Sequence, residues 1–221
     1  MNFIDQKIED YSLASTSVEP DSLQKLTRET NLKTYMPRML SGNLQGRILS
    51  MLSKLIQPKL IIEVGTFTGY SATCLAEGLA QGGKLITYEI NDEVAVLAQK
   101  HFESAGISDV VEIKIGDATD LLKKIDEEID LIFIDADKVN YSKYWKILFP
   151  KLRPGGIIIA DNVVWSGKVL DPENQQDEET QGLIAFTKNA LAEKNAEQVL
   201  IPVRDGLLVI RKKNEKIIFP L

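Results

Sequence analysis

A group of charged residues interrupts an apolar stretch near the middle of the chain. The sequence IDLIFIDADKVNY, residues 129–141, passes abruptly from isoleucine and phenylalanine into Asp135, Ala136, Asp137 and Lys138. Two carboxylates and an ammonium at the mouth of a buried strand form either a solubilising turn or a reactive site.

A second polar pair, Asp161 and Asn162, follows the apolar run GGIIIA. Because neighbouring parallel strands end close together, we expect Asp135, Asp161 and Asn162 to converge. Three oxygen ligands with open positions suit Mg²⁺, Mn²⁺ or Ca²⁺ and do not suit zinc. The alternative is that Asp161 and Asn162 only begin a loop, as such residues often do.

The sequence EVGTFTGYS, residues 63–71, indicates a ligand-binding turn between a strand and a helix. Gly65 and Gly69 allow close backbone approach, but their G-x-x-x-G spacing is not the dinucleotide G-x-G-x-x-G. Glu63 disfavours a phosphate and favours a positively charged ligand, for which S-adenosylmethionine (SAM) is suitable. Glu89 could accept hydrogen bonds from both ribose hydroxyls, and adenine could lie against residues 116–118. Alternatively, both glutamates are ordinary residues at strand ends.

The elements that must position these residues follow a regular rhythm. Helices are expected at about 2–14, 20–34 and 43–57, and a further one at about 178–193. Between them, five apolar strands alternate with helices, the pattern of a parallel sheet covered on both faces; the strands are 59–65, 84–90, 110–116, 129–135 and 155–161. Two last strands, 196–203 and 206–212, are so close that they must form an antiparallel hairpin. The predicted fold is an α/β, Rossmann-like, doubly wound sheet of seven strands with one antiparallel strand.

One domain is expected over residues 1–221. It would comprise a helical arm at 1–57, a Rossmann-like core at 58–213 and a tail at 214–221.

The ordered motifs of residues 35–213 resemble those of the cation-dependent SAM O-methyltransferases, the catechol and caffeoyl-CoA enzymes with their bacterial relatives. The matching stretches are MLSGNLQGRIL (39–49), EVGTFTGYSA (63–72), YEIND (88–92), FIDADKVNY (133–141), GGIIIADNVVWSG (155–167) and PVRDGLLVIRK (202–212). The resemblance implies a homodimer and a divalent ion held by Asp135, Asp161 and Asn162. It also implies a cofactor site formed by Ser41, Glu63, Gly65, Thr66, Phe67, Tyr70, Ser71, Glu89, Asp117, Ala118, Asp135 and Tyr144.

The same resemblance implies catalytic roles for Lys138, as general base, and for Asp135. A phenolic hydroxyl has a pKa of about 10, so it needs a cation to favour the oxyanion. Lys138 could take the proton if its own pKa were lowered, or it could simply pair with Asp137. The predicted acceptor-binding residues are Met39, Lys138, Trp165 and Arg204. Trp165 could instead anchor its loop, and Arg204 could be only part of the hairpin turn.

One segment departs from the plant caffeoyl-CoA enzymes, which hold coenzyme A with basic and aromatic residues after the metal-binding loop. The matching segment, 171–189, is acidic and contains no arginine. Acidic residues would repel the phosphates of coenzyme A. The sequence therefore favours a small, uncharged vicinal diphenol or hydroxylated aromatic as the acceptor.

Composition limits the alternatives. The net charge of −6 and the scattered basic residues argue against a nucleic-acid partner. The sequence has no apolar run long enough to cross a membrane and no signal-peptide pattern, and its single cysteine, Cys74, suits the cytoplasm. The only histidine, His101, is expected to be structural and to lie on a surface helix. A nicotinamide-dependent oxidoreductase and a non-catalytic SAM-binding module are the competing functions.

Overall fold

The computed structural model describes residues 5–214 and contains one seven-stranded sheet with the order β3-β2-β1-β4-β5-β7-β6. The strands are β1 (Leu60–Val64), β2 (Lys84–Glu89), β3 (Val111–Ile115), β4 (Ile129–Ile134), β5 (Leu152–Ala160), β6 (Ala196–Ile201) and β7 (Leu207–Lys212). Strands β1 to β5 pair in parallel, and β7 is antiparallel to both β5 and β6. The predicted fold class is confirmed.

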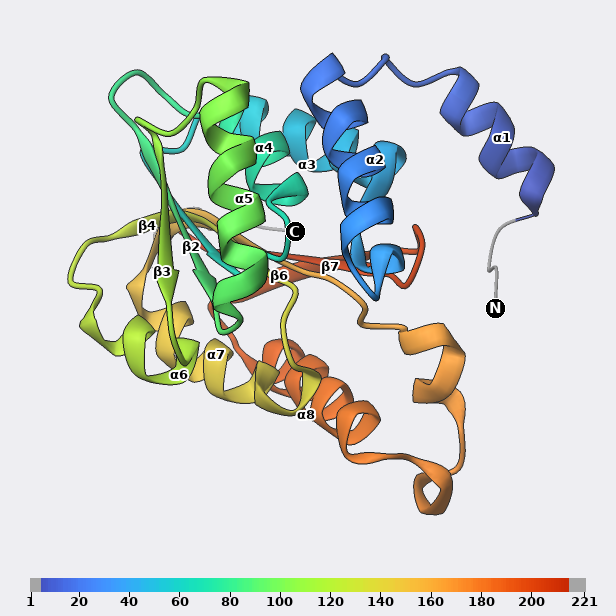
Figure 1. Ribbon diagram of the computed structural model, residues 1–221. Coiled ribbons are helices and arrows are strands. Elements are labelled where there is room, and N and C mark those ends of the chain that lie inside the picture. The colour runs from blue at the N-terminus through green and yellow to red at the C-terminus, as the bar shows by residue number, and fades with distance from the viewer. Residues whose placement is uncertain (1–4, 215–221) are drawn as a thin grey trace.

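Helices cover both faces of the sheet (Figure 1). One face carries α2 (Asp21–Lys33), α3 (Gly42–Ile56), α4 (Tyr70–Ala76) and α5 (Asp92–Ala105). The other face carries α6 (Ala118–Leu121), α7 (Tyr141–Leu148) and α8 (Glu178–Ala192). Each face has its own apolar core, and β1 and β4 contribute to both because they are buried on both sides.

Helix α1 (Gln6–Ala14) lies away from the sheet at the N-terminal end of the chain (Figure 1). None of its residues is buried. The sheet and its two helical layers are therefore complete without α1.

Two of the helices that alternate with the strands are shorter than the stretches 69–82 and 117–128 that the sequence predicts for them. Helix α4 ends at Ala76, and Gly78 just after it lies directly against the backbone of Ser53 on α3, where a Cβ would approach within 2.2 Å. Helix α6 has four residues and continues as a 3₁₀ turn, Leu122–Lys124. The first four residues of the chain and nearly all of the expected tail, 215–221, lie outside the described residues.

The described part of the chain contains no helix that is both long and apolar enough to cross a membrane.

Candidate active site

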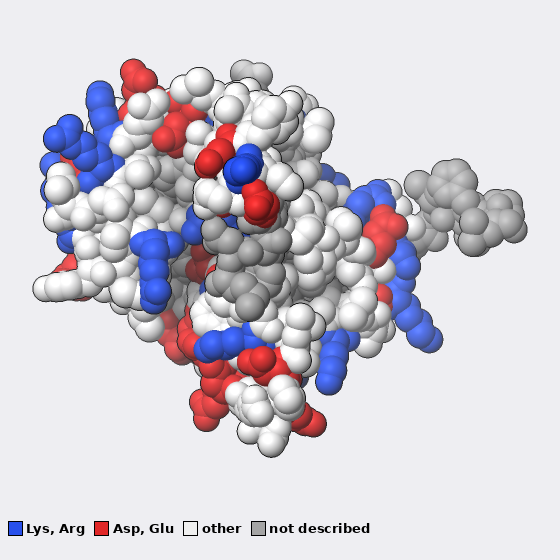
Figure 2. Space-filling view, turned by 90° about the vertical axis from the view of Figure 1, so that its right-hand side faces the viewer, with Lys and Arg blue, Asp and Glu red and all other residues white. Residues whose placement is uncertain are grey.

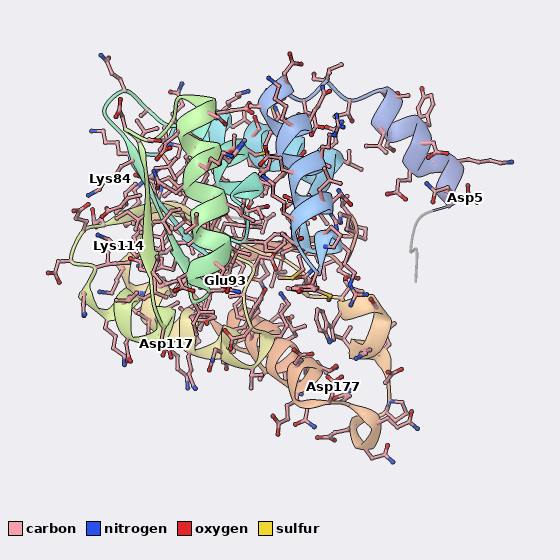
Figure 3. All side chains as sticks on the ribbon, viewed as in Figure 1. Asp5, Lys84, Glu93, Lys114, Asp117 and Asp177 are labelled. Atoms are coloured by element: carbon pink, nitrogen blue, oxygen red, sulfur yellow. The ribbon has the colours of Figure 1, made fainter. Side chains whose placement is uncertain are left out.

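A cavity of about 1040 Å³ lies at the carboxyl ends of the strands, where β1 separates β2 from β4 and the strand order reverses. This is the edge at which open α/β sheets bind ligands. Figure 3 shows Glu93 and Asp117 at this edge, whereas Lys84, at the beginning of β2, lies toward the opposite one. With one exception, Glu63, every residue that the sequence predicted for the cofactor, metal, catalytic or acceptor site lines this cavity.

Gly65 allows the ends of β1 and β4 to approach each other closely. Its φ of +104° lies in the region that favours glycine, and a Cβ there would lie 1.9 Å from the carbonyl oxygen of Asp135. The backbone amide of Asp135 also donates to the carbonyl of Val64 at 2.9 Å. The glycine of the first turn therefore places the charged residues that follow β4.

Glu63, which the sequence predicts as a cofactor-binding residue, is buried behind the wall of the cavity and does not line it in this structure. It is fully buried and accepts hydrogen bonds from the hydroxyls of Ser71, at 2.6 Å, and Thr87, at 2.5 Å. Burial raises the pKa of Glu63 to about 8 despite these bonds, because the charged form is desolvated. Glu63 positions Ser71, which does line the cavity.

Glu89 is oriented by backbone groups at the end of β2. Its carboxylate accepts from the amides of Phe67 at 2.8 Å, Ile90 at 3.0 Å and Asn91 at 2.9 Å. Phe67 has a φ of +48°, so the turn after β1 is bent into the left-handed region where it meets Glu89. A carboxylate has about four acceptor positions, and three are occupied here, so Glu89 has about one left for a ligand.

Asp161 is the most unusual carboxylate of the site. It is only 3% exposed, accepts from the Gln45 amide at 2.6 Å, and accepts from the backbone amide of Asn162 at 2.7 Å. Burial, and then the negative charge of Asp135, raise the pKa of Asp161 to about 7. Gln45 was not predicted from the sequence, because 116 residues separate it from Asp161.

Lys138 pairs with Asp135 rather than with Asp137. Its ammonium lies 2.9 Å from the Asp135 carboxylate and 3.1 Å from the Tyr141 hydroxyl, and the residue is 7% exposed. Burial opposes the charge, but Tyr141 and Asp135 raise the pKa of Lys138 above its ordinary value. In this structure the direction is opposite to the lowering that a general base requires.

Tyr141 is a site residue that the sequence analysis missed. It is fully buried, and its hydroxyl donates to the carbonyls of Ile134 at 3.2 Å and Asp161 at 3.1 Å while accepting from Lys138. The hydroxyl thus joins the ends of β4 and β5. The spacing of three residues between Lys138 and Tyr141 at a helix start was the available signal.

The remaining acidic residue of the motif stays outside this cluster. Asp137 is exposed and accepts hydrogen bonds from Tyr144 and Asn140. Asp137 therefore supports the turn and the start of α7 and is not the partner of Lys138.

The segment after Asp161 has a strained backbone. Asn162, Trp165, Ser166 and Gly167 have φ values of +61°, +47°, +53° and +87°, a region that residues other than glycine rarely adopt. The Asp205 carboxylate accepts from the Ser166 amide at 3.0 Å and holds the segment in place. Such strain often accompanies functional segments.

Arg204, which the sequence predicts as an acceptor-binding residue, also connects two segments of the cavity wall. Although it lines the cavity, its guanidinium donates to the carbonyls of Arg38 at 3.4 Å, of Leu40 at 2.7 Å and of Ser41. Arg204 therefore holds the segment before α3 to the β6–β7 turn.

Aromatic and charged side chains form the outer wall. Trp165 lies below the ammonium groups of Lys138 and Lys168, which are 5.6 and 5.9 Å from its ring centre. Lys168 also forms an ion pair with Asp177 at 2.7 Å. Met39, another residue that lines the cavity, is 54% exposed. His101 is not in this wall: it is buried on α5 and lies 3.0 Å from the Thr73 hydroxyl, so it is structural, though not on the surface.

The donor set fits a hard divalent cation. Asp135, Asp161 and Asn162 offer two carboxylates and an amide oxygen, the ligands that Mg²⁺, Mn²⁺ and Ca²⁺ prefer. In the described part of the chain, no three histidine, cysteine, aspartate or glutamate side chains gather around a possible metal position, so the third ligand would have to be the amide. The buried Gln45 Oε1 atom beside Asp161 also has no hydrogen-bond partner in the protein.

The family model described as O-methyltransferase matches residues 13–213. The chain belongs to the O-methyltransferase family. A catechol O-methyltransferase of Niastella koreensis is 38% identical to it over 189 residues, which cover 84% of this chain and 85% of the relative. Caffeoyl-CoA O-methyltransferase 1 of Eucalyptus globulus is 32% identical over 204 residues, which cover 88% and 82%.

Solved structures of other O-methyltransferases share the fold. The enzyme from Bacillus cereus in complex with S-adenosylhomocysteine (SAH) matches with a TM-score of 0.86 and 30% identity, over 94% of this chain and 97% of that chain. The O-methyltransferase TomG from Streptomyces achromogenes, in complex with SAM, matches with a TM-score of 0.86 and 28% identity, over 94% and 96%. The predicted family and enzyme class, a SAM-dependent O-methyltransferase, are confirmed, and the oxidoreductase and the non-catalytic module are set aside.

Proposed function

We propose that this O-methyltransferase transfers the methyl group of SAM to a hydroxyl oxygen of a small vicinal diphenol, with a divalent cation bound at Asp135, Asp161 and Asn162. The observation that carries the proposal is the buried carboxylate of Asp161. It lies on the cavity wall, and its pKa is raised first by burial and then by Asp135. Two carboxylates so placed favour a bound cation.

The donor half of the cavity supports SAM as the methyl donor. Glu89 offers its remaining acceptor position to a ribose hydroxyl, and Asp117 and Ala118 line the wall where adenine would lie. Ser41 and Ser71 line the part nearest the amino-acid end of the donor. None of these groups is a cationic phosphate-binding cradle, which agrees with a donor that carries no phosphate.

The part of the cavity lined by Asp135, Asp161 and Asn162 supports activation of the acceptor's hydroxyl group by a cation. When bound, a divalent cation would favour the oxyanion of a chelating diphenol. Asp161 is held for this role by Gln45, and Asp135 is held by the close approach at Gly65. Both ligands are therefore positioned by contacts within the protein.

We propose Lys138 as the residue that receives the acceptor's proton. It can do so only after the Asp135 charge has been drawn away from it, because the ion pair keeps Lys138 protonated in this structure. Tyr141 holds the Lys138 ammonium in the cavity wall in either case.

The acidic border of the cavity supports a small acceptor without phosphates. Glu179 and Asp205 line the cavity, and Lys168 is paired with Asp177. Figure 2 shows acidic side chains gathered around the lowest part of the visible face, at the height where Figure 1 places the segment before α8. A coenzyme A thioester would bring its phosphates close to these carboxylates.

The test compares Asp161→Asn with Asp171→Asn, a matched variant of an exposed aspartate outside the cavity. We expect Asp161→Asn to lose at least about a hundredfold in methylation of a catechol and to lose Mn²⁺ binding, measured by electron paramagnetic resonance. SAH affinity should stay within about twofold for both variants. Undiminished methylation by Asp161→Asn in EDTA would refute the cation proposal.

We also propose a homodimer in the cytoplasm. Exposed apolar residues on and beside α1, among them Ile8, Tyr11 and Val18, support an association between copies, and the buried free thiol of Cys74 agrees with a reducing compartment. Light scattering after size-exclusion chromatography tests the dimer, because a monomer at micromolar concentration would contradict it.

A further inference from the structure

The β6–β7 turn, residues 202–206, connects the two lips of the cavity. On one side, the Arg204 guanidinium donates to the carbonyls of residues 38, 40 and 41. On the other side, the Asp205 carboxylate accepts from the Ser166 amide, and the Asp205 carbonyl accepts from the Val164 amide at 2.8 Å. One short turn therefore holds the segment beside the donor pocket and the segment that carries Trp165.

The backbone of the turn is constrained by its conformation and its contacts. Arg204 has a φ of +51°, and Gly206, at +85°, lies so close to Val164 that a Cβ would come within 2.4 Å of its side chain. The Gly206 carbonyl accepts from the Val163 amide at 3.2 Å. The guanidinium is thus presented from a fixed backbone, which lowers the entropy cost of holding its partners.

The segment that Arg204 holds has few other attachments. Tyr35, Met36 and Met39 are 103%, 43% and 54% exposed, and Leu40 is the one apolar side chain of this segment that joins the core formed by residues 5–214. The backbone bonds of this segment are local, as in the bonds of Met39 to Met36 and of Leu40 to Pro37. Three carbonyls would lose this donor if the guanidinium were removed.

We infer that Arg204 is a positioning residue: it holds residues 38–41 closed beside the donor and thereby strengthens donor binding, rather than recognising the acceptor. This inference rests on the proposed SAM site. Guanidinium suits the task because its planar fork can reach several carbonyls at once, which an ammonium cannot do in the same geometry.

The experiment uses three variants of the full chain: Arg204→Ala, Arg204→Lys and Arg211→Ala. Arg211 is the matched control, because it lies in the same hairpin, forms an ion pair with Glu197 at 2.8 Å and does not line the cavity. SAH affinity is measured by calorimetry, and KM is measured separately for SAM and for a catechol. Wild-type binding of SAH is measured first, because its failure would refute the proposed function and not the role of Arg204.

Tryptic cleavage after the exposed Arg38 gives a readout that does not depend on activity. We expect Arg204→Ala to weaken SAH binding about tenfold, to raise the KM for SAM more than that for catechol, and to be cleaved faster after Arg38. Bound SAH should slow that cleavage. Arg204→Lys should recover part of the affinity, and Arg211→Ala should behave as the wild type in every measurement.

Two outcomes would overturn the inference. If Arg204→Ala keeps its SAH affinity and its cleavage rate but raises the KM for catechol, Arg204 recognises the acceptor. If Arg211→Ala weakens SAH binding as much as Arg204→Ala does, the effect comes from general destabilisation of the hairpin.

Discussion

Replacing the buried Glu63 by glutamine should make the protein more stable at alkaline pH and leave it nearly unchanged at acidic pH. The side chain is 0% exposed and touches the hydroxyls of Ser71 and Thr87. A glutamine oxygen can accept from Ser71, and its NH₂ can donate to Thr87, whose hydroxyl lies 2.6 Å from that of Thr66. The substitution therefore removes a charge and changes little else.

The size of the stability change follows from the pKa of Glu63 in the unfolded chain and in the folded protein. Burial raises the pKa of Glu63 from 4.5 to about 8. The unfolded chain releases this proton above about pH 4.5, whereas the folded protein keeps it to about pH 8, so the wild type loses stability as the pH rises through this interval. At about 1.4 kcal/mol per pH unit, the loss approaches a ceiling of about 5 kcal/mol.

The assay is urea unfolding of both proteins at several pH values between 5 and 9, followed by circular dichroism. The difference between the two free energies of unfolding isolates Glu63, because every other titrating group is common to both proteins. Relative to their difference at acidic pH, we expect the free energy of unfolding of Glu63→Gln to exceed that of the wild type by about 3 kcal/mol at pH 7. By pH 9 this difference should grow by up to about 1 kcal/mol more.

Glu77→Gln provides a control of the opposite sign. Burial opposes the charge of Glu77, but Arg47, Lys54 and Ser50 lower its pKa to about 2, so its carboxylate stabilises the fold above about pH 4.5 and that contribution is lost as the pH falls toward 2. Glu77→Gln should therefore be less stable than the wild type at pH 8. A difference between Glu63→Gln and the wild type that stays constant from pH 5 to pH 9 would refute the reasoning on Glu63.

Two further substitutions test how the site is held. Gly65→Ala should lower the free energy of unfolding by more than about 4 kcal/mol, because the new Cβ would lie 1.9 Å from the Asp135 carbonyl at a φ of +104°. Thermal unfolding measures the loss. A loss below about 1 kcal/mol would show that β1 and β4 can move apart at little energetic cost. Tyr141→Phe should cost about 1 to 3 kcal/mol and lower kcat for catechol methylation while SAH affinity is retained, because Lys138 loses its hydroxyl partner at 3.1 Å; an unchanged kcat would contradict a positioning role for Tyr141.

The sequence predicted the sheet well because each strand is a short apolar run followed by a turn. The reversed strand β7 was also predictable, since the connection to β6 is too short for a crossover. Helix lengths were less predictable. Gly78, just after the end of α4, contacts α3, and tertiary contacts of that kind leave no periodic signal.

The charged residues of the site were found from their positions at strand ends, but their partners were not. Gln45 reaches Asp161 across 116 residues, and nothing in the surrounding helical pattern distinguishes it from other polar residues. Glu63 shows the opposite problem. Its place in a recognisable motif suggested a ligand contact, yet the pleat of β1 turns its side chain into the interior, toward Thr87 on β2.

The left-handed residues Trp165, Ser166 and Gly167 bear on how enzymes of this family can acquire specificity for a new acceptor. The two that are not glycine each cost roughly 1 to 2 kcal/mol in this conformation, which neighbours such as Asp205 must offset. Replacements that relax this turn would therefore release strain while they reshape the acceptor wall. Most new binding surfaces evolve at the expense of stability, but the acceptor wall at residues 165–167 can change with a gain in stability.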